Sequence, residues 1–173
     1  MAAAVEDVRA EQEVGADFAA VFAAHRRDVY RLAYLLCGDH SAAEDAAADA
    51  FARVYPHWLK GEVDDAGAYL RRAVVNQVQG RFRRRFAERR RLLRVATDEQ
   101  DRRSAEDEIA DHDQVARALH RLPPRQRAAI VLRYFVDLSE AGVADAMGTS
   151  VGTAKSHVSR GLDRLRDLLG EPE

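Results

Sequence analysis

The stretch from Met147 to Leu169, MGTSVGTAKSHVSRGLDRLRDLL, decides how the C-terminal part of this chain folds. The preceding residues Ser139 to Met147 have the apolar spacing of a short helix. Gly148 then permits a sharp turn, and Ser150 stands where the N-cap of a following helix is expected. The pattern therefore predicts two helices joined by a tight turn, an arrangement typical of helix-turn-helix proteins that bind DNA.

The second of these helices has two different halves. Its back half carries leucines at core spacing, which would anchor the helix in the domain: Leu162, Leu165, Leu168 and Leu169. Its front half carries small donors and cations, which suit base edges and phosphates: Thr153, Lys155, Ser156, His157, Ser159 and Arg160. The pattern alone also allows a simpler interpretation, in which the last helix of an all-helical domain is merely amphipathic.

The composition favours helices over sheets. The chain has 173 residues, of which 47% are hydrophobic and only 7% aromatic, with a formal net charge of −2. No segment shows useful alternation of apolar and polar residues, and none approaches the roughly 20 apolar residues of a membrane span. Cys37 is the single cysteine, which excludes an intrachain disulfide and a zinc site built from cysteines. We expect an all-α cytoplasmic protein without a metal or another cofactor.

Helical spacing also marks the N-terminal half. A first helix runs from Phe18 to a stop at Gly38, and a second begins with a capping-box pattern at Ser41 and Glu44 and ends near Tyr55, just before Pro56. After a loop, a third helix carries a buried stripe: Leu70, Val74, Val78 and Phe82. Farther on, a helix after Pro123 and Pro124 is predicted to place four residues in a second core: Ile130, Val131, Tyr134 and Phe135.

These segments predict two small helical domains joined by a flexible linker. We expect a disordered tail at 1–14, a first domain at 15–90, a linker at 91–108 and a second domain at 109–171. Residues 81–94 contain eight arginines against one glutamate, whereas residues 97–113 contain eight acids against two arginines. So dense a basic block favours a polyanionic partner, although a solvated helix end neutralised by the acidic segment is the alternative.

Three segments together resemble the extracytoplasmic-function (group IV) family of bacterial RNA polymerase sigma factors. LPPRQRAAIVLRYFVDLSEAGVADAMGTSVGTAKSHVSRGLDRLR, from Leu122 onward, resembles the family's region 4, which binds the promoter −35 element. AAEDAAADAFARVY and AYLRRAVVNQVQGRFRRR, within residues 42–85, resemble region 2. The resemblance covers about 15–90 and 109–169. It implies a factor that binds core RNA polymerase, recognises the −10 and −35 elements and promotes DNA melting.

The resemblance also implies roles for individual residues. An acidic helix docks on the polymerase β′ subunit in this family, and here those positions are Glu44, Asp45, Asp49 and Arg53. The −10 element would be held by the third helix and by the loop Leu59–Gly67 that captures a flipped base: Lys60, Arg72, Asn76, Gln79, Arg83 and Arg84. The −35 reader is the helix near Val151. The implied partners are the β′ and β subunits of core polymerase, promoter DNA and an anti-sigma factor, with the free protein a monomer.

Two other functions compete with this interpretation. The carboxylates of Glu44, Asp45 and Asp49 could bind Mg²⁺ in a helical hydrolase, and His112-Asp113 superficially suggests a phosphohydrolase. The remaining histidines show no ligand spacing, and no phosphate-binding glycine loop is present in the sequence. A regulator that binds duplex DNA as a dimer is the second competitor, although no dimerisation zipper is visible. Dependence on core polymerase distinguishes it from a sigma factor.

Overall fold

The protein, described here by a computed structural model, consists of helices joined by short connections in the part of the chain that is described, residues 2–92 and 114–170. The elements in order are α1 (Ala2–Cys37), α2 (His40–Leu59), α3 (Ala66–Leu92), α4 (Gln114–Arg121), α5 (Pro124–Ile130), the π-helical turn η1 (Val131–Phe135), α6 (Glu140–Met147) and α7 (Val151–Gly170). No strand occurs in these residues, which confirms the predicted all-α class. None of these helices is both long and apolar enough to cross a membrane.

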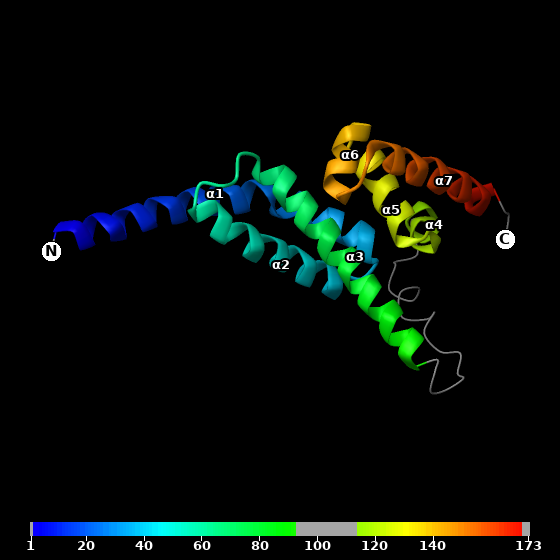
Figure 1. The fold of residues 1–173 in the computed structure, drawn as a ribbon, viewed down its shortest axis with the longest axis horizontal. Coiled ribbons are helices and arrows are strands. Elements are labelled where there is room, and N and C mark those ends of the chain that lie inside the picture. Colours follow the sequence, from blue (N-terminus) through cyan, green and yellow to red (C-terminus); the bar gives the residue numbers. More distant parts are fainter. Residues whose placement is uncertain (1, 93–113, 171–173) are drawn as a thin grey trace.

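Helices α1, α2 and α3 pack together as the N-terminal half (Figure 1). Small residues on α2 make this packing close: Ala43, Ala46, Ala47 and Ala50 are all 9% exposed or less. Alanine at positions i, i+3, i+4 and i+7 forms one continuous helix face that lets neighbouring helices approach closely. The predicted stripe of α3 is confirmed, with Leu70 and Val74 fully buried, Val78 4% exposed and Phe82 packed against the core.

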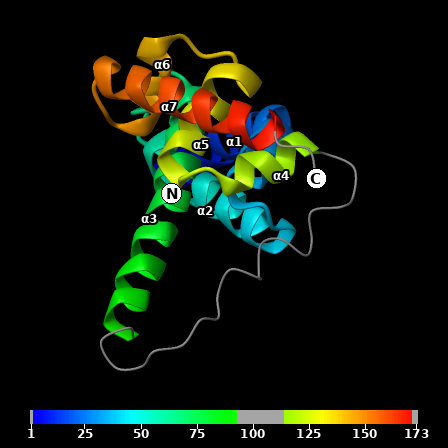
Figure 2. The same cartoon turned by 90° about the vertical axis from the view of Figure 1, so that its right-hand side faces the viewer.

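Helices α4 to α7 form the C-terminal half, which packs directly on α1 and α3 (Figure 2). Leu119, Ile130, Leu132 and Val143 are at most 1% exposed and lie in the same hydrophobic cluster as the core of the first half. The two predicted helical units therefore share one continuous core in this structure. The C-terminal end of α3 projects beyond the other helices (Figures 1 and 2).

The N-terminal half differs from the sequence expectation in three places. Helix α1 begins at Ala2, so residues 2–14, expected as a disordered tail, are helical. Helix α2 continues through Pro56 to Leu59. Its N-cap is Asp39, whose carboxylate accepts the N–H of Ala42 at 2.6 Å, and the expected box at Ser41 is not the cap. An aspartate one residue after Gly38 satisfies the same orphan N–H groups.

The prediction of Tyr134 and Phe135 as core residues is wrong, because they are 54% and 52% exposed. The π-helical turn η1 explains the difference: the N–H of Val136 donates to the carbonyl of Val131 at 3.1 Å, an i→i+5 bond. Such a widened turn breaks the 3.6-residue period and rotates the following side chains out of the buried stripe. Leu132 takes the core position instead, and on α7 Leu169 lies at the surface, 36% exposed.

The predicted linker falls almost entirely outside the described residues. Helix α3 reaches Leu92, so the first two residues of the predicted linker, 91 and 92, are helical. The acidic segment 97–113 lies outside the described residues, so its neutralisation of the basic block at 81–94 remains a prediction.

Candidate nucleic-acid interface

The predicted helix-turn-helix is formed by α6 and α7. Gly148 ends α6 in the left-handed region, with φ 60° and ψ 45°. The N–H groups of Gly148 and Thr149 return to the carbonyls of Asp145 and Ala144 at 3.1 and 2.9 Å. Ser150 then caps α7, because its hydroxyl accepts the N–H of Thr153 at 3.2 Å. Both glycine and serine thus act as the sequence predicts.

Two small residues seat α7 on the domain. Ala154 and Gly161 are its buried positions. A Cβ atom at Gly161 would lie 2.9 Å from Cγ1 of Ile130, which is closer than side chains pack. Glycine is therefore required for α7 to cross α5 at this distance. The opposite face of α7 is left exposed to solvent.

That exposed face holds the six residues predicted to read the −35 element. Two hydroxyls are already bonded locally: Thr153 Oγ1 lies 2.8 Å from Ser150 Oγ, and Ser156 Oγ donates to the carbonyl of Gly152 at 3.0 Å. Lys155 pairs with Glu140 of α6 at 2.9 Å, with both side chains at least half exposed. Ser159 and Arg160 are exposed. Lys155, Ser159 and Arg160 accordingly expose an ammonium, a hydroxyl and a guanidinium group on this face.

His157 differs from the other five because it is half-buried. Burial, followed by the nearby charges of Arg125 and Arg160, lowers the pKa of its imidazole below the usual value. A neutral ring is a donor at one nitrogen and an acceptor at the other. His157 is therefore better suited to form a hydrogen bond than to form an ion pair with a phosphate.

Sequence reasoning missed two residues that border this face. Arg133 donates to the carbonyl of Leu138 at 2.7 Å, and its guanidinium lies 5.9 Å from the ring centre of Tyr134. Arg133 and Tyr134 line a cavity of about 410 Å³ together with Lys155 and Ser159 of α7. The sequence RYF at 133–135 places a basic residue beside two aromatic ones, which could have indicated an exposed binding surface. The helical period instead predicted Tyr134 in the core.

The four predicted docking residues all lie on α2 and differ in exposure and in their contacts with α3. Glu44 and Asp45 are exposed near the start of the helix, and Asp45 pairs with Arg81 of α3 at 3.2 Å. Asp49 is half-buried and accepts the side-chain amide of Gln77, whose oxygen accepts Arg53 at 3.0 Å. Gln77 is 7% exposed and was not predicted. Asp45, Asp49 and Arg53 therefore all contribute contacts between α2 and α3, while the exposed side chains of Glu44, Asp45 and Arg53 are also accessible to a partner.

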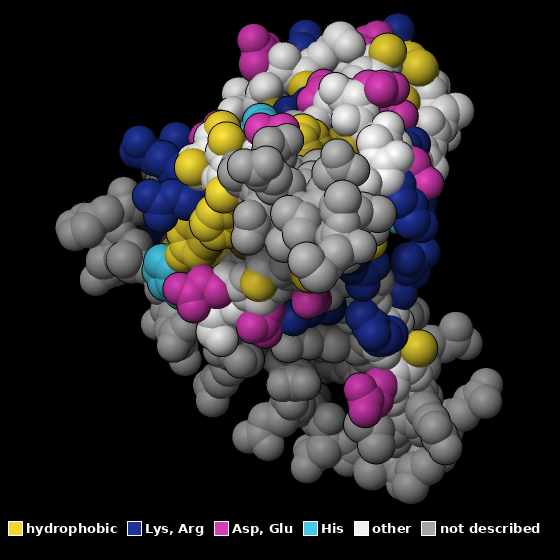
Figure 3. Space-filling view, turned by 90° about the vertical axis from the view of Figure 1, so that its left-hand side faces the viewer, with side chains coloured by type: hydrophobic (Ala, Val, Ile, Leu, Met, Phe, Trp, Pro, Cys, Tyr) yellow, Lys and Arg dark blue, Asp and Glu magenta, His cyan; other side chains and the backbone are white. Residues whose placement is uncertain are grey.

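Large hydrophobic side chains are also exposed on α1 and α2. Phe22, Tyr55 and Leu59 are 46%, 41% and 46% exposed, and the ring of Phe22 lies 4.7 Å from that of Phe51. Figure 3 looks onto the end of the molecule from which α1 projects, and hydrophobic side chains are visible there among charged ones. Single exposed apolar residues are common, but three large ones on adjacent helices suit a protein partner.

The residues predicted to hold the −10 element lie on α3 and at the end of α2. Asn76, Arg83 and Arg84 are exposed on α3, the last two toward its projecting end. Lys60 is exposed as the residue that caps α2, at the start of the loop to α3. Asn76, Arg83, Arg84 and Lys60 are thus accessible to a nucleic acid.

Arg72 and Gln79 differ from these four residues. Arg72 contacts the C-terminal half, and Gln79 is partly buried. Arg72 pairs with Asp145 of α6 at 3.0 Å. Gln79 is half-buried, and its amide nitrogen has no hydrogen-bond partner in the described part of the chain. Together with Phe82, they form a stripe at i, i+7 and i+10 on α3. The C-terminal half covers part of this stripe.

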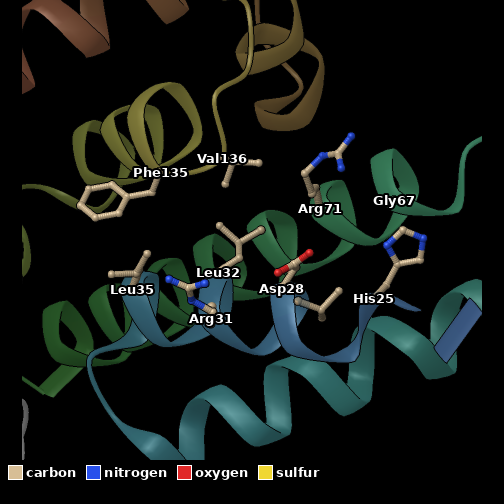
Figure 4. Close-up of a pocket in the computed structure, with 10 residues that line it drawn as sticks. His25, Asp28, Arg31, Leu32, Leu35, Gly67, Arg71, Phe135 and Val136 are labelled. Carbon is tan, nitrogen blue, oxygen red and sulfur yellow. The ribbon is translucent and has the colours of Figure 1, made fainter. Parts of the chain in front are cut away.

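The junction of the two halves contains a buried guanidinium. Arg127 of α5 is 5% exposed and donates to four carbonyls: Leu36 at 2.6 Å, Leu119 at 3.0 Å, His120 at 2.7 Å and Leu122 at 3.3 Å. Burial lowers the pKa of Arg127 to about 10, which leaves the group charged at neutral pH. Beside the junction, Phe135 and Val136 face α1 across a cavity of about 340 Å³ (Figure 4).

Because His120 is half-buried at this junction, we predict that acid weakens the packing of the two halves against each other. Burial, and secondarily the charge of Arg127, lowers its pKa from 6.5 to about 4. A separated or unfolded chain binds the proton with a pKa near 6.5, so the packed form loses stability as the pH falls from about 6.5 toward 4. After allowance for partial exposure, we expect a loss of roughly 1 kcal/mol at pH 5.

The measurement is thermal unfolding of the wild type and His120→Gln at pH 7.5 and pH 5. Arg127 of α5 faces the imidazole, and the Cys37 thiol of α1 interacts electrostatically with that guanidinium, so both belong to the titrating environment. The wild type should lose more stability on acidification than the variant. Equal losses in the two proteins would show that His120 is not the responsible group.

The geometry does not assemble the metal site of the hydrolase interpretation. Within the described ranges, no group of three or more histidine, cysteine, aspartate or glutamate side chains is arranged to hold a metal ion. His112 and Asp113 lie outside those ranges.

Comparisons with known proteins place both halves in one family. Residues 21–88 match the model of sigma-70 region 2, and residues 112–165 match that of sigma-70 region 4. The chain is 32% identical to the ECF RNA polymerase sigma factor SigE of Mycolicibacterium smegmatis, over 97% of this chain and 67% of that protein. It is 36% identical to the RNA polymerase sigma-E factor of Streptomyces antibioticus, over 78% of this chain and 74% of that protein.

Solved structures agree with this fold. The sigma factor RpoE of Bartonella quintana, crystallised with the anti-sigma factor NepR, superposes with a TM-score of 0.69 and 26% identity over 91% of this chain and 99% of that one. CnrH, solved with the cytosolic domain of CnrY, superposes with a TM-score of 0.61 and 22% identity over 94% and 96% of the two chains, a likeness of fold. The chain therefore belongs to the extracytoplasmic-function family of RNA polymerase sigma factors.

Proposed function

We propose that this chain directs core RNA polymerase to promoters by recognising their −35 and −10 elements, and that it helps to separate the two DNA strands there. The observation that carries the proposal is the seating of α7: Gly161 lies against Ile130, while Lys155, Ser159 and Arg160 occupy the free face. A recognition helix needs both properties, because one face must be fixed by the domain while the other enters the major groove.

The N-terminal half supplies the other two contacts of the proposal. Glu44 and Asp45 present negative charge to a basic surface of the β′ subunit, and Arg83, Arg84 and Asn76 present cations and an amide to the −10 strand. A single strand is bound by cations that follow its backbone and by groups that reach its bases. The β subunit is expected to contact the C-terminal half, and the free protein is expected to be a cytoplasmic monomer.

An anti-sigma factor is a further proposed partner. The RpoE structure from Bartonella quintana is a complex with the anti-sigma factor NepR, and this chain superposes on nearly the whole of that sigma factor. We therefore infer that a protein of this kind regulates the chain, with the exposed apolar residues of α1 and α2 as one candidate surface.

The test of the proposal is DNA binding with and without polymerase. At one fixed salt concentration, a promoter fragment is titrated with the free chain, with core enzyme and with both together. We expect tight and sequence-specific binding from the combination and weak binding from the free chain, because the C-terminal half covers part of α3. Equally tight and specific binding by the free chain would instead favour a regulator that acts without polymerase.

Charge reversal at Asp45 should weaken binding to core polymerase by about tenfold, equivalent to about 1.4 kcal/mol. Its side chain is 65% exposed, so the fold should change in stability by less than about 1 kcal/mol even though the pair with Arg81 is lost. The matched control is Glu62→Lys in the loop after α2, since Glu62 is 52% exposed and pairs with His57. Pull-down affinities that are equal for the two variants would remove Asp45 from the docking surface.

Replacement of Arg160 by alanine should reduce promoter binding in a way that depends on the −35 sequence. A side chain that reads a base contributes about 1–3 kcal/mol of discrimination, whereas a phosphate contact weakens all sequences alike. Holoenzyme affinity for fragments with native and altered −35 elements distinguishes the two. Arg166→Ala, farther along α7 and 73% exposed, is the control, and a loss no larger than that of the control would place Arg160 outside the interface.

A further inference from the structure

The end of α1 is one place where the two halves of the chain are in close contact. Arg127 reaches across from α5 and donates to the carbonyl of Leu36 at 2.6 Å, in the last turn of α1. The carbonyls of a last helical turn lack intrahelical donors and carry partial negative charge, which suits a guanidinium. In the described residues no carboxylate forms an ion pair with Arg127, so the carbonyl of Leu36 and the three carbonyls of Leu119, His120 and Leu122 are its main hydrogen-bond acceptors.

The contacts of Arg127 divide between the two halves. Three of its four carbonyl partners, Leu119, His120 and Leu122, belong to the C-terminal half and would stay with it if the halves moved apart. The bond to Leu36 and the ring of Phe82, 5.6 Å from the guanidinium, belong to the N-terminal half. Separation would therefore break two specific contacts of a group that remains anchored on one side.

His120 makes a second close contact at the same point. Gly38 follows α1 with φ +77°, and a Cβ atom there would lie 2.7 Å from Cε1 and 2.8 Å from Nδ1 of His120. The imidazole thus rests directly on the glycine backbone. A residue with a side chain at 38 would push the ring, and with it α4, away from α1.

The packed arrangement restricts α3. Arg72 is paired with Asp145 of α6, and Phe82 lies under Arg127. The Arg72–Asp145 pair is largely exposed on both sides and adds little stability by itself. Its importance is that it places α6 against a residue of the proposed −10 surface, so a strand of DNA and α6 compete for this part of α3.

We propose that Arg127, together with His120 seated on Gly38, is a latch that holds the free chain closed over one side of α3. The proposal rests on the proposed function only for what α3 binds once it is uncovered. When a binding-competent form is a minor fraction of the population, the apparent affinity falls by that fraction. A variant that opens the latch should therefore bind a −10 single strand more tightly without any new contact to DNA.

The experiment compares the full-length wild type with Gly38→Ala. The matched control is Gly61→Ala: Gly61 has φ +68°, so alanine causes the same backbone strain, but its Cβ would meet nothing within 4 Å. Small-angle X-ray scattering should show a larger radius of gyration for Gly38→Ala than for the wild type and Gly61→Ala. Adding His120→Ala to Gly38→Ala removes the clashing ring and leaves the bond from Arg127 to Leu36, so the radius should fall below that of Gly38→Ala alone.

A second variant reaches the junction from α3. Phe82→Leu removes the ring beneath Arg127 while keeping an apolar side chain, and it should also increase the radius of gyration. If Gly38→Ala does not fold, as judged by circular dichroism, this variant carries the test. A variant that folds but scatters like the wild type and Gly61→Ala would overturn the latch.

DNA binding then separates the latch from the proposed function. Gly38→Ala should bind a labelled single strand of the −10 sequence about tenfold more tightly than the wild type, which corresponds to a shift of about 1.4 kcal/mol in the closing equilibrium. If the variant is open in scattering but gains no affinity, the latch stands and the proposed role of α3 fails. If affinity rises while the scattering is unchanged, the latch is wrong.

Discussion

Replacement of Arg127 by methionine should lower the free energy of unfolding by about 3–5 kcal/mol, because buried bonds from a charged donor are worth about 1.5–3 kcal/mol each and four carbonyls lose theirs. Removing a charge from the interior returns part of this loss, since burying a guanidinium is itself costly. Methionine fills a similar length but donates nothing, so the carbonyls of Leu36, His120 and Leu122 lose this donor, while that of Leu119 keeps the N–H of Leu122 at 3.1 Å.

Chemical denaturation of full-length protein measures this effect. Arg125→Met is the control: Arg125 lies two residues earlier on α5 and is exposed, so its loss should change stability by less than about 0.5 kcal/mol. Arg127→Lys should fall between, because a single ammonium cannot reproduce the fork that bridges these carbonyls. Comparable stability of Arg127→Met and Arg125→Met would show that the buried network contributes little.

Gly161→Val should destabilise the C-terminal half by about 3 kcal/mol, at the upper end of what overpacking typically costs. The Cβ atom alone would lie 2.9 Å from Ile130 Cγ1, 3.3 Å from Ile130 Cδ1 and 3.4 Å from Gln126 Cβ. Ile130 is 1% exposed and cannot move outward without disturbing the core, so α7 must shift away from α5. A recognition helix displaced in this way should lose −35 binding even where the domain remains folded.

Gly170→Val on the same helix is the matched control, because a Cβ there would meet nothing within 4 Å. Both substitutions exchange a glycine of α7 for valine, but only the one at position 161 places the new side chain against α5. Unfolding and −35 affinity should both be affected in Gly161→Val and nearly unchanged in Gly170→Val. If the two variants behave alike, the close crossing of α5 and α7 is not what positions the recognition helix.

The local pattern of the sequence predicted the parts of the fold that local chemistry determines. The turn at Gly148 and the cap at Ser150 depend on residues within one or two turns, and both are confirmed. The spacing that buries Leu70, Val74 and Val78 likewise depends on one helix. The resemblance of three segments to regions 2 and 4 of one sigma-factor family predicted the family, and the comparisons confirm it.

Features that depend on contacts between distant segments could not be predicted in this way. Arg127 is one arginine among many in the sequence, and its burial depends on carbonyls of α1 and α4 that meet only in the folded chain. The pairing of Asp49 with Gln77 converts an expected surface acid into a bond between α2 and α3. Tyr134 and Phe135 were misplaced because a π-helical turn leaves no periodic signal in a short segment.

Transcription with purified core RNA polymerase is the measurement that tests the central claim most directly. Promoter fragments from the source genome are transcribed by core enzyme alone, by core enzyme with this chain, and by core enzyme with Gly161→Val, and the 5′ ends of the transcripts are mapped. The account predicts a set of discrete start sites, preceded by shared −35 and −10 sequences, that appears only with the intact chain. Start sites that are no more specific with the chain than with core enzyme alone would contradict it.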